Sequence, residues 1–313
     1  MASTMLVVGS MIIDMVVRSS KIPVPGENIC GASFAMVAGG KGANQAVAAL
    51  KLGNMVSLLG KVGEDHFGDM LVSEVQSAGV DTSLILRTST HSTGVALIVV
   101  EESTGLNTIV VDPGANMALE EDDLDILAKC PPPDVALFQL EAPIGFVIEA
   151  AKRCAAMGAK TVLDAGPPRG ATPEVLDGFD VVSPNRFELA DITGMPVDSM
   201  EETALAANRL VDAGGGTVVV KMGPEGALAA TADGCWHFPT FDIEPVDATA
   251  AGDAFTAALA TAMCEGKSLE ESVAFANAAG ALAVTRAGAL PSMPSRAEVE
   301  ALFASREVSC SAL

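Results

Sequence analysis

A glycine-rich segment near the start of the chain has the residue types of a ligand-binding turn. Residues 39–45 read GGKGANQ and lead into an apolar helical run that continues through Leu50. Glycines ahead of a helix let a ligand approach the backbone closely, with the first N–H groups of the helix aimed at it. The segment is not a Walker A loop, because Lys41 is followed by Gly42 rather than by Ser or Thr. On spacing alone, an ordinary turn before a helix explains it equally well.

A second segment, residues 246–253, reads VDATAAGD and precedes a predicted helix over Ala254–Met263. The small residues 250–252 leave backbone N–H groups uncovered at a helix N-terminus, where the peptide dipoles would stabilise a transferring phosphoryl group. This pattern is that of an anion hole. Asp253 lies in the first helical turn, where an Asp usually caps the helix. The residues alone therefore leave two interpretations of Asp253 open, a cap and a catalytic carboxylate.

Two further segments lie where a predicted strand ends. In residues 184–188, PNRFE, Asn185 and Glu188 share a helix face, so both could reach the water shell of a phosphate-bound Mg²⁺. Helix capping explains the same pair. In residues 220–226, VKMGPEG, a strand leads into a glycine-rich turn, a pattern that by itself indicates little.

The elements that must position these segments are those of an α/β fold. From Pro133 onward, short β-rich runs alternate with helical patterns, which indicates βαβ units and a mostly parallel, doubly wound sheet flanked by helices. Gly158 and Gly214 stand where two of the helices should stop. The predicted strands are Val135–Leu140, Thr161–Asp164, Val181–Val182 and Thr217–Lys221, and the predicted helices are Phe146–Met157 and Glu201–Ala213.

The first third of the chain predicts a small separate sheet. Ile29–Ala38, Val95–Val100 and Asn107–Val111 have strand patterns without long helices between them. Such a sheet, built from roughly residues 11–40 and 91–113, would form a lid over a pocket at the carboxyl ends of the core strands. We therefore expect residues 1–313 to form one domain with a β-sheet lid.

Composition excludes several classes of function. The formal net charge is -22, from 18 basic and 40 acidic residues, which argues against a broad nucleic-acid footprint or binding to an anionic membrane. An anionic substrate would need local positive charge. A dinucleotide-dependent oxidoreductase is disfavoured, because the turn after the first strand, Val8-Gly9-Ser10-Met11, lacks the fingerprint glycines.

The cysteines and the N-terminus predict a cytoplasmic protein. The six cysteines have no C-x-x-C and no regular spacing, so we expect neither a disulfide framework nor a zinc site. The first apolar stretch has no basic residues before it and is interrupted by Asp14, which is typical of a buried strand rather than a signal peptide. No apolar run approaches the ~20 residues of a membrane span.

Taken together, GGKGANQ and DATAAGD resemble the two signature regions of the ribokinase (phosphofructokinase B) family of sugar kinases. Both motifs occur in this order at this separation, which makes chance agreement improbable. The resemblance extends along nearly the whole chain: Gly9-Ser10, Asp14, Pro25-Gly26-Glu27, Gly63-Glu64-Asp65, residues 92–96 (STGVA), Gly114-Ala115-Asn116, residues 139–141 (QLE), Pro184-Asn185 and residues 283–286 (AVTR).

The resemblance implies a role for each matching residue. Asp253 would take the proton of the sugar hydroxyl, with Ala250, Ala251 and Gly252 as the anion hole, and this favours the catalytic interpretation of Asp253 over the cap. The sugar would be bound by Asp14, Gly40, Lys41, Gly42, Asn44 and Glu141. The nucleotide, expected to be ATP, would be bound by Asn185, Lys221, Gly223, Gly226, Gly252 and Asn277, with Glu188 associated with Mg²⁺. A monovalent cation, usually K⁺, would be bound by Asp247, Thr249, Ala283, Arg286, Gly288 and Ser292.

The implied reaction is ATP-dependent phosphorylation of the primary 5-hydroxyl of D-ribose, giving ribose 5-phosphate and ADP. At the place of Ile12, ribokinases commonly carry Asn and deoxyribokinases an apolar residue, so 2-deoxyribose is the nearest alternative, with other sugars or nucleosides behind it. Lys221 stands where the family often has Thr, and it would either contact phosphate or lie exposed. A sugar-binding regulator without turnover is disfavoured by the intact Asp253. A homodimer is expected, because a partner could cover the edges and apolar faces of an exposed lid sheet.

Overall fold

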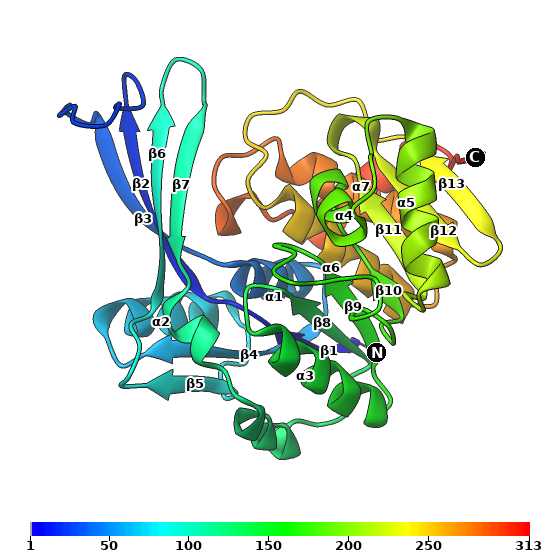
Figure 1. Cartoon of the computed structure of the whole chain (residues 1–313), viewed down its shortest axis with the longest axis horizontal. Helices are drawn as coiled ribbons and strands as arrows, with labels where there is room; N and C mark the ends of the chain where they lie inside the picture. The colour runs from blue at the N-terminus through cyan, green and yellow to red at the C-terminus, as the bar shows by residue number, and fades with distance from the viewer. Residues whose placement is uncertain (1) are drawn as a thin grey trace.

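The computed structural model describes residues 2–313 and contains two β-sheets (Figure 1). The larger sheet has ten strands, and from β11 to β5 each strand pairs in parallel with its neighbour, whereas β12, β13 and β14 continue the sheet antiparallel. In sheet order the strands are β14 (Ser311–Ala312), β13 (Gly234–Phe238), β12 (Ala227–Thr231), β11 (Thr217–Lys221), β10 (Val181–Val182), β9 (Lys160–Asp164), β8 (Val135–Gln139), β1 (Thr4–Val8), β4 (Met55–Gly63) and β5 (Ile85–Thr88). The predicted doubly wound, mostly parallel sheet is confirmed.

Helices cover both faces of the large sheet, and each face has its own hydrophobic core. The central strands β1 and β8 are almost completely buried and apolar apart from Thr4 and Gln139 at their ends, as is typical of strands covered on both faces. One face is covered by α1 (Lys41–Lys51), α2 (His66–Ala78), α6 (Ala251–Cys264), α7 (Leu269–Ala283) and α8 (Arg296–Phe303). The other is covered by α3 (Ile144–Ala156), α4 (Arg186–Thr193), α5 (Met200–Asp212) and the 3₁₀ helix η2 (Glu121–Lys129).

The predicted helices α3 and α5 are confirmed, and each is followed by the glycine expected to end it. Gly158 and Gly214 have φ angles of 93° and 99°, in the left-handed region that ends many helices. Helix α6 is rich in alanine and almost completely buried against α1 and α7. Small side chains allow neighbouring helices to approach closely, so this composition brings the start of α6 next to the start of α1.

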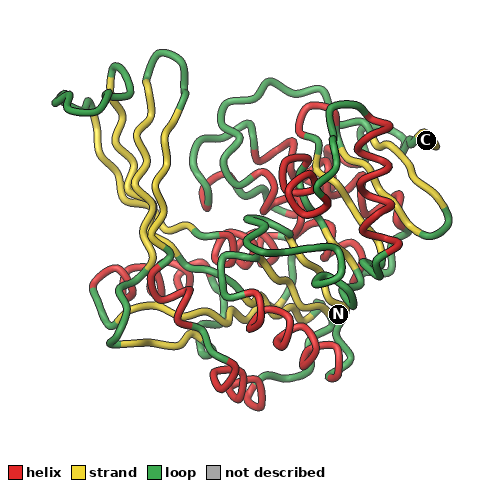
Figure 2. Tube along the Cα trace, in the orientation of Figure 1, coloured by secondary structure: helices red, strands yellow, loops and turns green. Residues whose placement is uncertain are grey.

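The second sheet has four strands and stands away from the large sheet in Figures 1 and 2. Its order is β3 (Ser33–Gly39), β2 (Ile12–Ser19), β6 (Gly94–Glu101) and β7 (Asn107–Asp112). The strand predicted over Ile29–Ala38 begins only at Ser33, where the register with β2 starts at Arg18. The Ala32 N–H still donates to the Arg18 carbonyl at 2.7 Å, but residues 29–32 form no further ladder with β2. The other two predicted strands of this sheet are confirmed.

Two further predictions were made from the sequence alone. Within the described residues, no helix is both long and apolar enough to cross a membrane. All six cysteines lie in this part of the chain as free thiols.

Candidate active site

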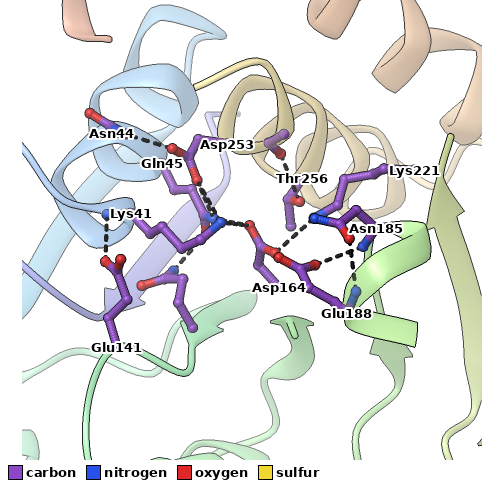
Figure 3. A network of polar contacts seen from close by, with 12 residues as sticks. Lys41, Asn44, Gln45, Glu141, Asp164, Asn185, Glu188, Lys221, Asp253 and Thr256 are labelled. Carbon is purple, nitrogen blue, oxygen red and sulfur yellow. Dashed lines mark hydrogen bonds and ion pairs between the residues drawn. The ribbon is translucent and has the colours of Figure 1, made fainter. Parts of the chain in front are cut away.

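The polar residues of the site gather at one edge of the large sheet, where its parallel strands end (Figure 3). Asp164 is the last residue of β9 and Lys221 the last of β11, while Glu141 and Asn185 follow β8 and β10. The carboxyl ends of parallel strands are the usual place for ligands in open α/β sheets. The N-termini of α1 and α6 point to the same edge.

The first signature segment forms the N-terminus of α1. Its N-cap, Gly40, has φ 89°, and a Cβ on Gly42 would lie 2.5 Å from the backbone that follows β1, so both positions require glycine. The Glu141 carboxylate accepts a hydrogen bond from the Lys41 backbone N–H at 3.1 Å and another from the Ser10 hydroxyl. Glu141 thus joins the loop after β8 to the start of α1.

The second signature segment forms the N-terminus of α6. Its N-cap, Ala250, has φ 60° and ψ 12°, and it is the only non-glycine residue with a positive φ within residues 2–313. A left-handed alanine is strained, and such strain persists where surrounding structure requires it, often at functional sites. The turn begins a fourteen-residue helix whose first N–H groups have no side-chain cap, although the Ala251 N–H donates to the Ala248 carbonyl at 3.3 Å.

Asp253 does not cap α6, so the capping interpretation is wrong. The residue is buried, and its side chain points toward α1, where Oδ2 accepts a hydrogen bond from Asn44 Nδ2 at 2.9 Å and Oδ1 accepts one from Gln45 Nε2 at 3.0 Å. Burial raises the pKa of the Asp253 carboxyl, and the nearby Asp164 raises it further, whereas Lys41 and the two amides act in the opposite direction. A buried carboxyl with a raised pKa is suited to accept a proton.

Lys41 lies between two carboxylates. Its Nζ is 3.3 Å from Asp164 Oδ2 and 3.7 Å from Asp253 Oδ1. Burial would lower the pKa of Lys41, but the charges of Asp164 and Asp253 outweigh it and hold that pKa well above its usual range. Lys41 is therefore a permanent cation beside Asp253.

Asp14 brings the small sheet into the same site. It lies on β2, and its pKa is raised to about 6 by burial first and then by the negative charges of Glu141 and Asp253. Ile12, two residues earlier on the same strand, shares the face of Asp14 and is buried. The two sheets thus contribute carboxylates to one cluster.

Two buried amide oxygens in this region have no hydrogen-bond partner in the described part of the chain. They are Oδ1 of Asn44, whose residue is 6% exposed, and Oε1 of Gln139, which is fully buried and lies against Gly9. Buried polar atoms without partners are rare, and each calls for an explanation such as a ligand. Asn44 is part of the first signature segment, so a hydroxyl donor beside Asp253 would satisfy it.

Asn185 and Glu188 form a capping box at the start of α4, as the alternative interpretation predicted. Asn185 Oδ1 accepts from the Glu188 N–H at 2.9 Å, and Glu188 Oε2 accepts from the Asn185 N–H at 2.7 Å. The other carboxylate oxygen, Oε1, lies beside Gly166 and faces the Lys41 cluster. Capping therefore leaves one oxygen of Glu188 directed at the site.

Lys221 is enclosed in the site rather than exposed. Its side chain is 11% exposed, and its Nζ donates to Asp164 Oδ1 at 2.7 Å. A Cβ added to Gly252 would lie within 3.7 to 3.9 Å of the Lys221 side chain. This ammonium group therefore lies beside the first turn of α6.

The other predicted nucleotide-side residues lie farther along the same edge. Gly223 and Gly226, in the turn between β11 and β12, have φ angles of 58° and 91°, and a Cβ on Gly226 would clash with the Phe238 carbonyl at 2.1 Å. Asn277, on α7, donates to the same carbonyl at 3.2 Å. It also lines a small cavity with Phe241 and Arg306.

The predicted cation ligands lie on two segments that Asp247 joins, the loop before α6 and the stretch from the end of α7 to the 3₁₀ helix η4 (Leu290–Ser292). Its Oδ1 accepts from the N–H and the hydroxyl of Thr249 at 2.9 and 2.6 Å, and its Oδ2 accepts from the Gly288 N–H at 2.9 Å. Ala283 and Ser292 are buried, and the Arg286 guanidinium forms an ion pair with Glu298. No cluster of three His, Cys, Asp or Glu side chains suited to a metal occurs between residues 2 and 313.

Sequence reasoning missed two residues of the cluster, Asp164 and Gln45. Asp164 is completely buried and contacts Lys41, Lys221 and Gln45, whose Nε2 donates to Asp164 Oδ2 at 2.7 Å. Both were visible in the sequence, since Gln45 closes the first signature segment and Asp164 ends a predicted strand. A charged residue at the carboxyl end of a buried parallel strand was the signal available for Asp164.

Comparison with known proteins gives a consistent result. Residues 2–296 match the model of the pfkB family carbohydrate kinases. The chain is 38% identical to the ribokinase of Bacillus subtilis over 303 residues, which is 95% of this chain and 98% of that protein. It is 35% identical to the deoxyribokinase of Salmonella typhi over 294 residues, 92% of this chain and 95% of that one. The structure of Arabidopsis thaliana ribokinase complexed with ribose and ATP superimposes with a TM-score of 0.87 at 36% identity, covering 97% of this chain and 99% of the other.

Proposed function

Since the chain belongs to the pfkB family of carbohydrate kinases, which are phosphotransferases, we propose that it is a ribokinase that transfers the γ-phosphoryl group of ATP to the 5-hydroxyl of D-ribose. One observation carries the proposal. Asp253, a buried carboxylate with a raised pKa, lies at the N-terminus of α6 beside the Lys41 cation and the unpartnered Asn44 oxygen. A proton acceptor, an anion-binding helix end and a polar sugar site are thus combined in one place.

In the proposed reaction, Asp253 accepts the proton of the sugar's 5-hydroxyl group. The oxygen of that hydroxyl group attacks the γ-phosphorus of ATP. The bond between the γ-phosphorus and the bridging oxygen breaks, and ADP leaves with that oxygen. The N–H group of Gly252, after the Ala250 turn, stabilises the charge on the transferring group, together with that of Ala251 once it leaves its long 3.3 Å hydrogen bond to the Ala248 carbonyl. Asp253 retains lone pairs for the hydroxyl, because a carboxylate has about four acceptor sites and only two are used by Asn44 and Gln45.

The sugar site would consist of carboxylates, an amide and backbone groups from the start of β2, the start of α1 and the loop after β8. A carboxylate accepts hydrogen bonds from hydroxyl groups, and the Asn44 oxygen lacks a donor, so these groups suit a polyhydroxy ligand. The residues are Asp14, Gly40, Lys41, Gly42, Asn44 and Glu141.

The nucleotide would bind along β11, α7 and the start of α6, through Asn185, Lys221, Gly223, Gly226, Gly252 and Asn277. The free oxygen of Glu188 faces the cluster and fits the water shell of Mg²⁺. When bound, Mg²⁺ neutralises charge on the phosphates. Asn185 orients Glu188 through the capping box.

A monovalent cation would bind between the loops joined by Asp247, with Thr249, Ala283, Arg286, Gly288 and Ser292. A hard cation held by oxygens there would fix the turn that precedes the anion hole. We expect potassium to raise kcat well above its value in tetramethylammonium, measured at fixed ionic strength. Equal rates in the two salts would contradict the cation site.

2-Deoxyribose is the second candidate substrate. Ile12 places an apolar side chain on the face of Asp14, and the Salmonella typhi deoxyribokinase is nearly as similar as the ribokinases. An apolar pocket discriminates in kcat/KM against a substrate with an added hydroxyl by only ~10²-fold. A site built to bind a hydroxyl discriminates against a substrate that lacks it by ~10⁴-fold or more.

A panel of sugars with MgATP, with and without potassium, tests the proposal. We expect turnover of both pentoses with a ribose-to-deoxyribose ratio in kcat/KM below ~10³, and Ile12→Asn should shift that ratio toward ribose. Absence of ribose turnover would exclude the ribokinase assignment. An unchanged ratio in Ile12→Asn would show that Ile12 serves only in packing.

We also propose that the protein forms a homodimer through the small sheet. By strand register, Phe34, Met36, Leu97 and Val110 lie on one face of this sheet, with exposed fractions of 60%, 43%, 54% and 63%. Apolar surface of this extent on one sheet face favours burial against a second copy.

A further inference from the structure

Asp164 lies at the centre of the site and has no role in the proposed function so far. It is fully buried, and each carboxylate oxygen contacts a different lysine, with Oδ1 2.7 Å from Lys221 Nζ and Oδ2 3.3 Å from Lys41 Nζ. Burial would raise the pKa of Asp164, but the two ammonium groups outweigh it and hold that pKa below its usual range. Asp164 is therefore an anion that links two cations at the end of β9 (Figure 3).

The two lysines lie on either side of Asp164 (Figure 3). Lys41 lies toward the sugar side, 3.7 Å from Asp253 Oδ1. Lys221 lies toward the nucleotide side, against the first turn of α6 at Gly252. A single carboxylate thus determines the positions of both cations relative to the α6 N-terminus.

The charge of the whole molecule makes Lys221 important. The chain carries a formal net charge of -22, and a nucleotide triphosphate is itself a polyanion, so phosphate binding needs local positive charge. Lys221 is enclosed, where charge-assisted hydrogen bonds to phosphate are stronger than in bulk water. An ammonium group has three donors, of which Asp164 uses one, leaving others for a ligand.

We infer that Asp164 is a positioning residue, which orients Lys41 and the proposed nucleotide-binding Lys221 about the transferring phosphoryl group. This inference rests on the proposed function, since it requires a nucleotide at α6. The ion pair between Asp164 on β9 and Lys221 on β11 thus supplies a fixed positive charge, in addition to the N–H groups of α6.

The test is a double-mutant cycle with MgATP affinity measured by calorimetry in the absence of sugar. Lys221→Met should weaken MgATP binding about tenfold and change the sugar KM less than about twofold, since a charge-assisted bond is worth about a factor of ten or more. Lys221→Arg keeps the charge and should recover most of that affinity. Lys152→Met, which removes an exposed lysine on α3, is the matched control and should leave both quantities unchanged.

Asp164→Asn should weaken MgATP binding severalfold in the wild-type background and by less than about twofold in the Lys221→Met background. It should also lower kcat about tenfold or more, because Lys41 loses its anchor beside Asp253. If Asp164→Asn alone unfolds the protein, the double variant Asp164→Asn/Lys221→Met, which buries no unpaired charge at this pair, is compared with Lys221→Met instead.

Three outcomes would overturn the inference. The first is an unchanged MgATP affinity in Lys221→Met. The second is an equal loss of MgATP affinity in Lys221→Arg and Lys221→Met. The third is an equal loss of MgATP affinity on Asp164→Asn in the wild-type and Lys221→Met backgrounds. Each can occur while the wild type still phosphorylates ribose, which would leave the ribokinase proposal intact. A wild-type protein that binds no adenine nucleotide would contradict both proposals.

Discussion

Single residues in this site have environments that set their chemistry. Asp14, Asp164 and Asp253 are all aspartates, yet their neighbours shift their pKa values in different directions. The pKa of Asp164 lies below its usual range because its carboxylate contacts two lysines. The pKa of Asp14 is raised, by burial first and then by the carboxylates that it faces. The division of labour among chemically identical side chains therefore arises from position.

Asp253→Asn should keep the fold and sugar binding but lose turnover, because an amide cannot accept the hydroxyl proton. General-base assistance is typically worth ~10²–10⁴-fold in rate, so kcat should fall by that amount in a coupled ADP-release assay. Asp212→Asn, an exposed aspartate on α5, is the control and should retain full activity. A kcat for Asp253→Asn above about a tenth of the wild-type value would remove Asp253 from this role.

The raised pKa of Asp14 predicts that sugar binding depends on pH. The folded protein holds this proton up to about pH 6, whereas the ordinary pKa of an aspartate is 3.8. The contribution of Asp14 to the free energy of unfolding is therefore favourable at low pH and is lost as the pH rises from 3.8 to 6. Hydroxyl groups of the sugar donate to the ionised form, so sugar binding should release a proton near pH 6. We expect the sugar KM to rise about tenfold between pH 7 and pH 5.

Asp14→Asn is the control for this pH dependence. The variant should have a higher sugar KM at pH 7 and a flatter profile from pH 5 to 7. Glu141 and Asp253 face Asp14 and are both retained in the variant, so the comparison isolates the contribution of Asp14. A profile as steep as that of the wild type would show that the pH dependence does not come from Asp14.

At the scale of elements, two helix N-termini are held differently. The start of α1 is satisfied by Glu141 and Ser10, whereas the start of α6 follows a strained alanine and has no side-chain cap. An uncapped N-terminus keeps its N–H groups available to an anion. The strain at Ala250 is consistent with a turn retained for binding rather than for stability.

Ala250→Gly tests this interpretation of the α6 turn. Glycine adopts φ 60° without strain, so the free energy of unfolding should rise by about 0.5–1 kcal/mol in urea denaturation. We expect kcat to fall, because the more flexible glycine orders the anion hole less well. Ala251→Gly, one residue later and already helical, should instead lower stability by up to about 1 kcal/mol. A loss of stability in both variants would show that Ala250 carries no strain.

At the scale of the whole molecule, the site exists only where the two sheets meet. The large sheet contributes Asp164 and Lys221, and the small sheet contributes Asp14. The small sheet stands away from the large sheet and has an exposed apolar face (Figure 1). The partner subunit of the proposed dimer would therefore affect the position of this sheet.

The proposed dimer is tested by substitutions that place charged side chains on the exposed apolar face of the small sheet. Sedimentation equilibrium at micromolar concentration should give twice the mass of the chain for the wild type and the monomer mass for Phe34→Asp/Leu97→Asp, because two buried aspartates per subunit would lack partners. Leu205→Asp, which alters an exposed apolar residue on α5, should remain dimeric. A monomeric wild type would exclude the dimer.

The sequence by itself determined the fold class, the order of the main elements and the residues of both signature segments. These depend on local signals: strand and helix periodicity, glycines with positive φ such as Gly158, and motifs of contiguous residues such as 39–45. Such signals can be read without knowing which segments meet in space.

Only the tertiary structure decided how distant residues combine. Whether Asp253 caps its helix depends on Asn44 and Gln45, more than 200 positions earlier, and these draw its side chain away from the helix end. Likewise, the role of Asp164 follows from two lysines that β11 and α1 bring to it, and no local pattern marks such contacts. The physical reason is that the pKa and the contacts of an ionisable side chain depend on its neighbours. In this site the neighbours come from strands and helices that lie far apart in the chain.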